Sequence, residues 1–237
     1  MPCVLITGGG KRMGKGLAEA FAGKGWDIII HYNKSDLEAK ETAEKIRAKG
    51  LRSVAVKADL LSSVEINNAF YEGVDKLGIP DVLINNAGVF PSAIELKNLA
   101  EDVWDSTMGV NLKAHYLFSK VFAEKAKPGS RIINIASAGG MEVWKHRIPY
   151  NVSKAAAIHL TKALSRELAP ALSVNCICPG TIIFPENGET QAGSEKIPMG
   201  RFGAIDDIFD AAYFFATCTP FITGQILAVD GGFHNSR

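Results

Sequence analysis

Short runs that are almost wholly apolar alternate along the chain with longer segments in which apolar and charged residues are mixed. The short runs predict β-strands and the longer segments predict amphipathic helices. Strands are expected at residues 3–6, 27–32, 53–57, 81–85, 131–136, 173–177 and 225–229. Helices are expected at residues 14–25, 36–49, 64–77, 102–125, 150–168 and 208–216.

This alternation predicts an α/β fold, in which a parallel sheet is covered by helices on both faces. The strands are apolar throughout, as expected when both faces of a sheet are buried. No linker, repeat or low-complexity tract divides the sequence, so a single domain over residues 1–237 is expected. The long irregular stretch 181–199 is typical of a lid or binding loop, with a plain surface loop as the alternative.

Composition narrows the functional classes. The formal net charge is +1, which gives no strong field toward nucleic acid or anionic lipid. The four cysteines, Cys3, Cys176, Cys178 and Cys218, form no C-x-x-C pair, which favours buried thiols over a metal site. No signal peptide is recognised, and no apolar run nears the ~20 residues of a membrane span. We expect a cytoplasmic protein with a small-molecule substrate and no nucleic-acid or membrane partner.

A glycine-rich segment, T-G-G-G-K-R-M-G at residues 7–14, joins the first predicted strand to the first predicted helix. Glycines there permit a tight turn and close approach of a pyrophosphate, which the helix N-terminus attracts. In an alternating α/β chain this pattern predicts a dinucleotide site. The residues of this loop expected to contact the cofactor are Gly8, Gly10, Lys11, Arg12, Met13 and Gly14.

The end of the second strand indicates which dinucleotide binds. It reads H-Y-N-K-S at residues 31–35, with no carboxylate at the strand tip to hold a ribose 2′-hydroxyl. Asn33, Lys34 and Ser35 are expected at the cofactor instead. With Arg12, Lys34 would supply two cations for a 2′-phosphate, so the sequence favours NADPH. Asp36 follows directly and is expected to act as a helix N-cap beside Ser35.

Candidate catalytic residues stand later in the chain. Tyr150 and Lys154 share one face of a predicted helix, and an ammonium beside a phenol lowers its pKa. Tyr116 and Lys120 have the same Y-x-x-x-K spacing, so spacing alone decides nothing. Context favours Tyr150, because Ser137 directly follows a predicted parallel strand, where ligands bind in open α/β sheets. Tyr116 and Lys120 are interpreted as ordinary helix residues.

These residues together resemble the short-chain dehydrogenases/reductases over essentially the whole chain. The resemblance implies one Rossmann domain with a seven-stranded, doubly wound parallel sheet and usually a homotetramer, with a dimer as the alternative. It places further residues at the cofactor. These are Asp59 and Leu60 near the adenine, Asn86, Ala87 and Gly88 along the cofactor, and Pro179, Gly180 and Ile182 near the nicotinamide.

The resemblance also implies catalytic roles. Tyr150 would protonate a developing oxyanion, and Ser137 would donate a hydrogen bond to the same oxygen. Lys154 would tune Tyr150 and hold the nicotinamide ribose. Asn111 would hold a water in the proton relay, with a helix cap or kink as its alternative role. The implied activity is hydride transfer to a carbonyl, as in 3-oxoacyl thioester or small-ketone reductases.

Two departures leave a second activity open. Arg12 replaces the middle glycine of the usual loop, which resembles the pteridine-reductase branch, as do residues 31–35 and 179–186. Phe184 stands where the family often has Thr. Against this branch, its members typically carry Asp at the position of Ser137. The alternatives are therefore carbonyl reduction, reduction of a pterin C=N bond and, as a different class, a non-catalytic NADP-binding regulator.

The expected substrate-facing residues are Phe90, Trp144 and Phe184, whose rings suit a flat substrate or an apolar wall. A basic run at residues 145–147 would attract an acidic carrier or form a solvated face. The apolar segment 211–218 and the last strand predict a subunit interface.

Overall fold

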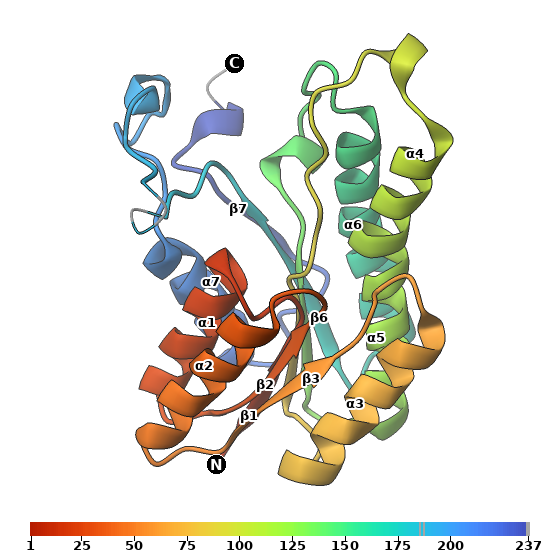
Figure 1. Cartoon of the computed structure of the whole chain (residues 1–237), viewed down its shortest axis with the longest axis vertical. Helices are drawn as coiled ribbons and strands as arrows, with labels where there is room; N and C mark the ends of the chain where they lie inside the picture. Colours follow the sequence, from red (N-terminus) through yellow and green to blue (C-terminus); the bar gives the residue numbers. More distant parts are fainter. Residues whose placement is uncertain (185, 187, 236–237) are drawn as a thin grey trace.

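A computed structural model describes residues 1–184, 186 and 188–235 of the chain. Within that part, seven strands form one parallel sheet in the order β3-β2-β1-β4-β5-β6-β7 (Figure 1). This confirms the predicted doubly wound fold. The strands are β1 (Cys3–Ile6), β2 (Asp27–Tyr32), β3 (Ser53–Lys57), β4 (Val82–Asn85), β5 (Arg131–Ile135), β6 (Ser173–Pro179) and β7 (Ile226–Val229).

Helices cover both faces of the sheet. Apolar residues of α1 (Arg12–Gly23), α2 (Asp36–Ala48) and α7 (Ile205–Thr217) share one core with the strands. Those of α3 (Ser63–Leu77) and α5 (Ala114–Lys125) form the core on the other face. There α4 (Glu101–Met108) and α6 (Ile148–Glu167) complete the layer, on the right of Figure 1. No helix of the described chain is long and apolar enough to cross a membrane.

One predicted helix, residues 102–125, is interrupted. Between α4 and α5 the structure has a π-helical segment, η2 (Gly109–Lys113). Such a segment contains an extra residue in the turn and is frequent at functional sites. The segment contains Asn111, for which a helix kink was the alternative role, although no proline marks the break.

The apolar character of α7 has a different cause from the one predicted. Ala212, Phe215 and Ala216 are buried in the core against α1 and the sheet, and only Phe214 of this group is strongly exposed. Most of the segment is therefore apolar because it packs inside one chain, while Phe214 of α7 and Leu227 of β7 stay exposed, and the predicted subunit interface is not tested. The predicted homo-oligomer, tetramer or dimer, remains a prediction, as does the cytoplasmic location.

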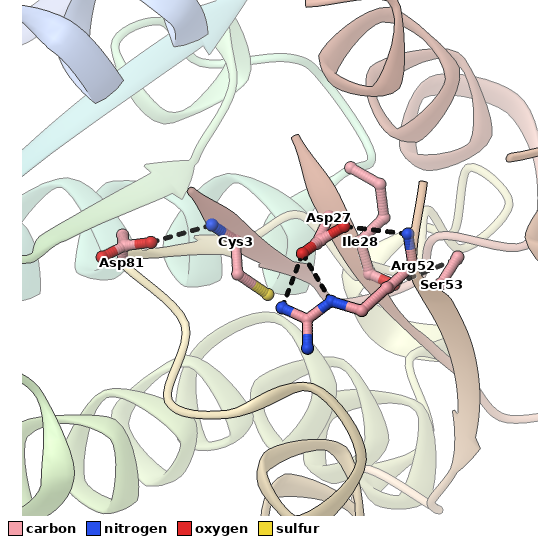
Figure 2. Close-up of polar contacts among 6 residues, drawn as sticks. All are labelled: Cys3, Asp27, Ile28, Arg52, Ser53 and Asp81. Carbon is pink, nitrogen blue, oxygen red and sulfur yellow. Dashed lines mark hydrogen bonds and ion pairs between the residues drawn. The ribbon is translucent and has the colours of Figure 1, made fainter. Parts of the chain in front are cut away.

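The amino ends of the strands are joined by a buried charge (Figure 2). The Asp27 carboxylate is fully buried and accepts hydrogen bonds from Nε and Nη2 of Arg52, at 2.9 and 2.7 Å, and from the Arg52 backbone N–H at 2.8 Å. Next to it, Asp81 accepts from the backbone N–H of Cys3 at 2.8 Å. These contacts join β2 to β3 and β1 to β4 at the edge opposite the strands' carboxyl ends.

Two histidines are also fully buried, His31 on β2 and His115 on α5. Burial lowers the pKa of His31 to about 4 and that of His115 to about 3, the latter also because of the nearby Lys154 ammonium. Both rings are therefore neutral at physiological pH. Each is held by a hydrogen bond between Nε2 and a backbone carbonyl, of Ala58 and Ala87 respectively.

We predict that Asp27→Ala lowers the free energy of unfolding by about 2–3 kcal/mol, because it leaves the donors of Arg52 without their buried acceptor. Urea denaturation measures the change. Glu72→Ala is the control, because Glu72 pairs with Lys76 on the exposed face of α3 and contributes about 0.5 kcal/mol or less. Equal losses in the two variants would contradict the importance of the buried carboxylate.

We also predict that stability falls as the pH is lowered from 6.5 to 5. In this range the two histidines take up protons in the unfolded chain but stay neutral in the folded one. The free energy of unfolding therefore falls by about 1.4 kcal/mol per pH unit for each histidine, once the pH is well below its unfolded pKa. Urea unfolding at pH 7, 6 and 5 measures this slope. His159→Gln, on the exposed face of α6, should leave it unchanged, and a wild-type free energy that stays constant over this range would show the prediction to be wrong.

Candidate active site

The carboxyl ends of all seven strands lie at one edge of the sheet, because the strands are parallel. The winding direction reverses between β1 and β4, the position at which open α/β sheets bind ligands. Thr7 joins the loop after β1 to the loop after β4 at this position. Its hydroxyl oxygen accepts hydrogen bonds from the backbone N–H groups of Asn86 and Ala87, both at 3.0 Å, and its carbonyl accepts from the Asn86 amide at 2.8 Å.

The glycine-rich loop after β1 is packed too tightly for side chains. Gly8 has φ +66°, and a Cβ on it would lie 2.9 Å from Cα of Ala87. A Cβ on Gly10 would lie 2.5 Å from Oγ of Ser35, and one on Gly14 would lie 2.1 Å from the Gly8 carbonyl oxygen. Helix α1 follows with no side-chain cap and no acidic residue in its first turn. This arrangement fits a dinucleotide pyrophosphate, which would lie against bare backbone and the uncapped helix end.

The carboxylate of Asp36, in the segment directly after β2, already has partners within the chain. Asp36 accepts a hydrogen bond from the Tyr32 hydroxyl and pairs with Lys40 at 2.8 Å. Ser35 holds the N-cap position, with no side-chain capping bond, so the predicted N-cap role of Asp36 is wrong by one residue. Lys34 is exposed. Asn33 donates to Asp59 at 3.4 Å, which brings the ends of β2 and β3 together as expected for an adenosine site.

The sequence suggested that Arg12 and Lys34 lie at one site, but in the structure the Arg12 side chain contacts other residues. Its φ of +49° is unusual for a residue with a side chain and fits the position that commonly holds glycine. Its guanidinium pairs with Glu189 at 2.8 Å and lies 4.6 Å from the ring centroid of Phe184. Glu189 also accepts from the backbone N–H of Phe184 at 3.0 Å. The phosphate loop is thus attached to the described part of the 181–199 loop, in which Pro185 and Asn187 lie outside the described residues.

Ser137, Tyr150 and Lys154 come together at the ends of β5 and α6. Ser137 follows β5 in an extended conformation, and its hydroxyl oxygen accepts a hydrogen bond from the backbone N–H of Gly139 at 3.1 Å. Lys154, only 4% exposed, donates from Nζ to the Ile135 carbonyl at 2.9 Å and lies 5.9 Å from the centroid of the Tyr150 ring. Tyr116 and Lys120 lie on the exposed face of α5, as interpreted from the sequence.

The electrostatics of this group differ from the expectation that Lys154 lowers the pKa of Tyr150. Burial raises the pKa of Tyr150, and the nearby Ser137 hydroxyl only partly opposes this effect. Burial also lowers the pKa of Lys154 to about 8, against an increase from Cys176 and Cys178. The thiols of these cysteines lie 3.9 Å apart behind the site, both fully buried as predicted.

Asn111 lies in the π-helical segment and is fully buried. Its side-chain oxygen accepts from the backbone N–H of Val89 at 2.7 Å, and its amide donates to the Val89 carbonyl at 3.0 Å and to the Ser153 hydroxyl at 3.1 Å. Asn111 therefore fixes the loop after β4 against the helix that carries Tyr150. A Cβ on Gly88 would lie 3.3 Å from the Asn111 side-chain oxygen and 3.4 Å from Nζ of Lys154, so glycine leaves space there.

Aromatic rings surround Tyr150. The Phe90 ring meets it edge-on at 4.6 Å between centroids, and the Trp144 ring is stacked at 6.0 Å with an interplanar angle of 14°. Arg147 lies over the Phe90 ring at 4.2 Å and donates to the Pro91 carbonyl, so it is not a solvated rim charge. The structure thus brings Phe90 and Trp144 together at the site, whereas Phe184 is buried with α1 and α7.

The remaining expected residues lie at the same edge. Leu60 is buried after β3, Pro179 ends β6, and Gly180 follows it against Asp230, whose Cα would lie 2.8 Å from an added Cβ. Sequence reasoning missed His31, His115, Ser153 and Glu189. A histidine inside the otherwise apolar strand D-I-I-I-H-Y was the one available signal for His31. The described residues hold no group of three or more His, Cys, Asp or Glu side chains that suits a metal ion.

Known proteins resemble this chain over nearly its whole length. The family model described as Enoyl-(Acyl carrier protein) reductase matches residues 10–234. A 3-oxoacyl-[acyl-carrier-protein] reductase from Synechocystis is 33% identical, covering 96% of this chain and 95% of that protein.

Solved structures agree. A blue fluorescent protein from a metagenomic library, in complex with NADPH, superimposes with a TM-score of 0.91 at 29% identity, covering 98% of this chain and 97% of that one. FolM alternative dihydrofolate reductase 1 from Brucella suis, in complex with NADP, has a TM-score of 0.91 at 28% identity, covering 100% and 96%. With the glycine-rich loop at the switch point and Ser137, Tyr150 and Lys154 assembled beside it, these matches show that the chain belongs to the short-chain dehydrogenase/reductase family of NAD(P)-dependent oxidoreductases.

Proposed function

We propose that this protein is an NADPH-dependent reductase of a carbonyl, either a 3-oxoacyl thioester or a small ketone or aldehyde. The observation that carries the proposal is the placement of Ser137, Tyr150 and Lys154 together at the ends of β5 and α6, with Nζ of Lys154 5.9 Å from the centroid of the Tyr150 ring. Two hydroxyls beside a buried ammonium suit an oxygen that gains negative charge. The similarity to a 3-oxoacyl-[acyl-carrier-protein] reductase supports this class of substrate.

Each residue has a physical role in this reaction. A bound NADPH would supply the hydride. Tyr150 donates its proton to the carbonyl oxygen as charge develops there, and Ser137 donates a hydrogen bond that holds that oxygen in place. The Lys154 ammonium, one turn along the same helix, favours the phenolate that remains after the proton is transferred. Asn111 fixes the loop after β4, and a water held near it as a proton relay remains part of the proposal.

NADPH is favoured over NADH by the charges after β2. Lys34 is exposed and available, while the nearest carboxylate, Asp36, is already engaged by Tyr32 and Lys40. The ribose 2′-hydroxyl of NADH would therefore lack the acidic partner typical of NAD sites, whereas the 2′-phosphate of NADPH would lie near the Lys34 ammonium. The neighbours in complex with NADPH and NADP agree.

A second candidate, reduction of a pterin C=N bond, is favoured by different observations. Phe90 and Trp144 offer rings on two sides of Tyr150, and aromatic surfaces of this kind stack on flat heterocycles. Arg12 stands in the phosphate loop, as in the pteridine-reductase branch, and the FolM structure is a similar neighbour. Ser137 favours the first candidate, because a hydroxyl suits a carbonyl oxygen. A non-catalytic NADP-binding regulator is the weakest candidate, because Ser137, Tyr150 and Lys154 are all assembled.

We predict that Tyr150→Phe lowers kcat by on the order of 10²–10⁴-fold, because the proton donor is lost while the ring remains. NADPH oxidation is followed with acetoacetyl thioester, a small diketone and a dihydropteridine. Tyr116→Phe is the matched control, because it removes a hydroxyl from the other Y-x-x-x-K pair and should leave kcat unchanged. Equal activity of wild type and Tyr150→Phe would refute the proposed role of Tyr150.

The substrate panel decides between the two candidates. Turnover of the thioester or the diketone supports carbonyl reduction and the role of Ser137. Turnover of the dihydropteridine alone refutes it and supports the second candidate. Absence of turnover with all three, in protein that binds NADPH, would refute both activities and support a regulator.

We predict that Lys34→Ala lowers kcat/KM for NADPH about tenfold and leaves that for NADH within twofold, because it removes one charge-assisted hydrogen bond to the 2′-phosphate. Initial rates with each cofactor measure the ratio. Lys45→Ala removes an equal charge further along α2 and serves as control. A proportionate loss with both cofactors would show that Lys34 does not read the 2′-phosphate.

A further inference from the structure

His31 connects two of the loops that bind the cofactor. Its Nδ1 accepts a hydrogen bond from the backbone N–H of Gly8 at 3.2 Å, in the phosphate loop. Its Nε2 bonds the carbonyl of Ala58 at 3.1 Å, the residue directly before the Asp59–Leu60 pair expected at the adenine. The ring thus spans from the loop after β1 to the loop after β3, from a position on the strand between them.

These two side-chain hydrogen bonds lie just past the last backbone pairs of β2 with its two neighbouring strands. The register of β1 with β2 ends at Ile6 and Ile30, and that of β2 with β3 ends at Tyr32 and Lys57. The backbone contributes one more bond on each side, from Gly9 N–H to the His31 carbonyl and from Ala58 N–H to the Tyr32 carbonyl. Past this point the strands diverge into loops, and the imidazole is the group that continues to join them.

The chemistry of the two partners fixes the state of the ring. A carbonyl oxygen only accepts, so Nε2 of His31 carries the proton, and Nδ1 is left with the lone pair that the Gly8 N–H requires. A protonated ring would place an N–H against the N–H of Gly8. The ring is 1% exposed and meets the edge of Phe118, at 5.4 Å between centroids, so it has no room to turn. The low pKa of His31 is consistent with this neutral tautomer.

We propose that His31 is a positioning residue for the cofactor, which sets the distance between the pyrophosphate loop and the adenosine segment. A dinucleotide contacts both segments at once and has a fixed separation between its adenosine and its pyrophosphate. If the two loops already have that separation in the free protein, binding does not have to order them. The entropic cost of binding is then smaller and the affinity is higher. The inference rests on the NADPH site proposed above and is independent of which substrate is reduced.

The test compares a whole cofactor with one half of it. His31→Leu keeps an apolar side chain of similar reach and removes both hydrogen bonds. We expect its Kd for NADPH, measured by fluorescence titration, to rise about tenfold, while its Kd for 2′-AMP, which reaches only the adenosine segment, changes less than about twofold. With saturating NADPH, kcat should stay within about threefold of wild type. His31→Gln, whose amide both donates and accepts, should recover much of the lost affinity.

Ile28→Ala is the control for stability, because Ile28 is a core residue of the same strand and touches neither loop. All binding is measured well below the melting temperature of each variant. If Ile28→Ala weakens NADPH binding as much as His31→Leu, or if His31→Leu weakens NADPH and 2′-AMP equally, the positioning role is overturned. Wild-type affinity in His31→Leu also overturns it, whereas wild-type protein that fails to bind NADPH at all refutes the proposed function instead.

Discussion

Parallel pairing of β1 with its two neighbours is the constraint on which the site depends. Because the strands run in one direction, every loop that carries a site residue leaves the sheet at the same edge. The chain turns to opposite faces after β1 and β4, and this opens space between the two loops. Thr7 prevents that space from widening, since its hydroxyl oxygen accepts from the N–H groups of Asn86 and Ala87. Gly8 can then lie against Ala87 with nothing between them.

Neutral groups surround the one buried cation of the catalytic group. The Lys154 ammonium donates to a backbone carbonyl rather than to a carboxylate, and burial lowers its pKa to about 8. A carboxylate partner would compete with the phenolate for this charge. The polar side chains nearby have other partners, since Ser137 accepts from the Gly139 N–H and Asn111 from the Val89 N–H, so the charge remains available to the reacting groups. The π-helical segment permits this, because its wider turn carries Asn111 at the junction of the β4 loop and α6.

Two segments expected at the substrate are attached to the fold in different ways. Phe90 and Trp144 border Tyr150 directly and are fixed by contacts with α6 and the Arg147 side chain. The 181–199 loop is joined to the phosphate loop by the ion pair from Glu189 to Arg12 and by the packing of Arg12 on Phe184, and to the rest of the chain by backbone hydrogen bonds with Gly203 and Gly231. Exposed pairs contribute little free energy.

The local pattern of apolar and polar residues was enough to predict the strands and much of the site. Apolar runs located all seven strands to within about two residues, and the residues that follow them, such as Ser137 and the 7–14 loop, identified the site because parallel strands gather their ends. Tertiary structure decided what depends on distance through space. It set the pKa of Tyr150, since burial outweighs the spacing to Lys154, and it directed Arg12 to Glu189 rather than to Lys34. It also gave His31 its partners, because Gly8 and Ala58 become neighbours only when three strands align. Sequence spacing records periodicity along one element, whereas desolvation and contacts between loops arise only from packing.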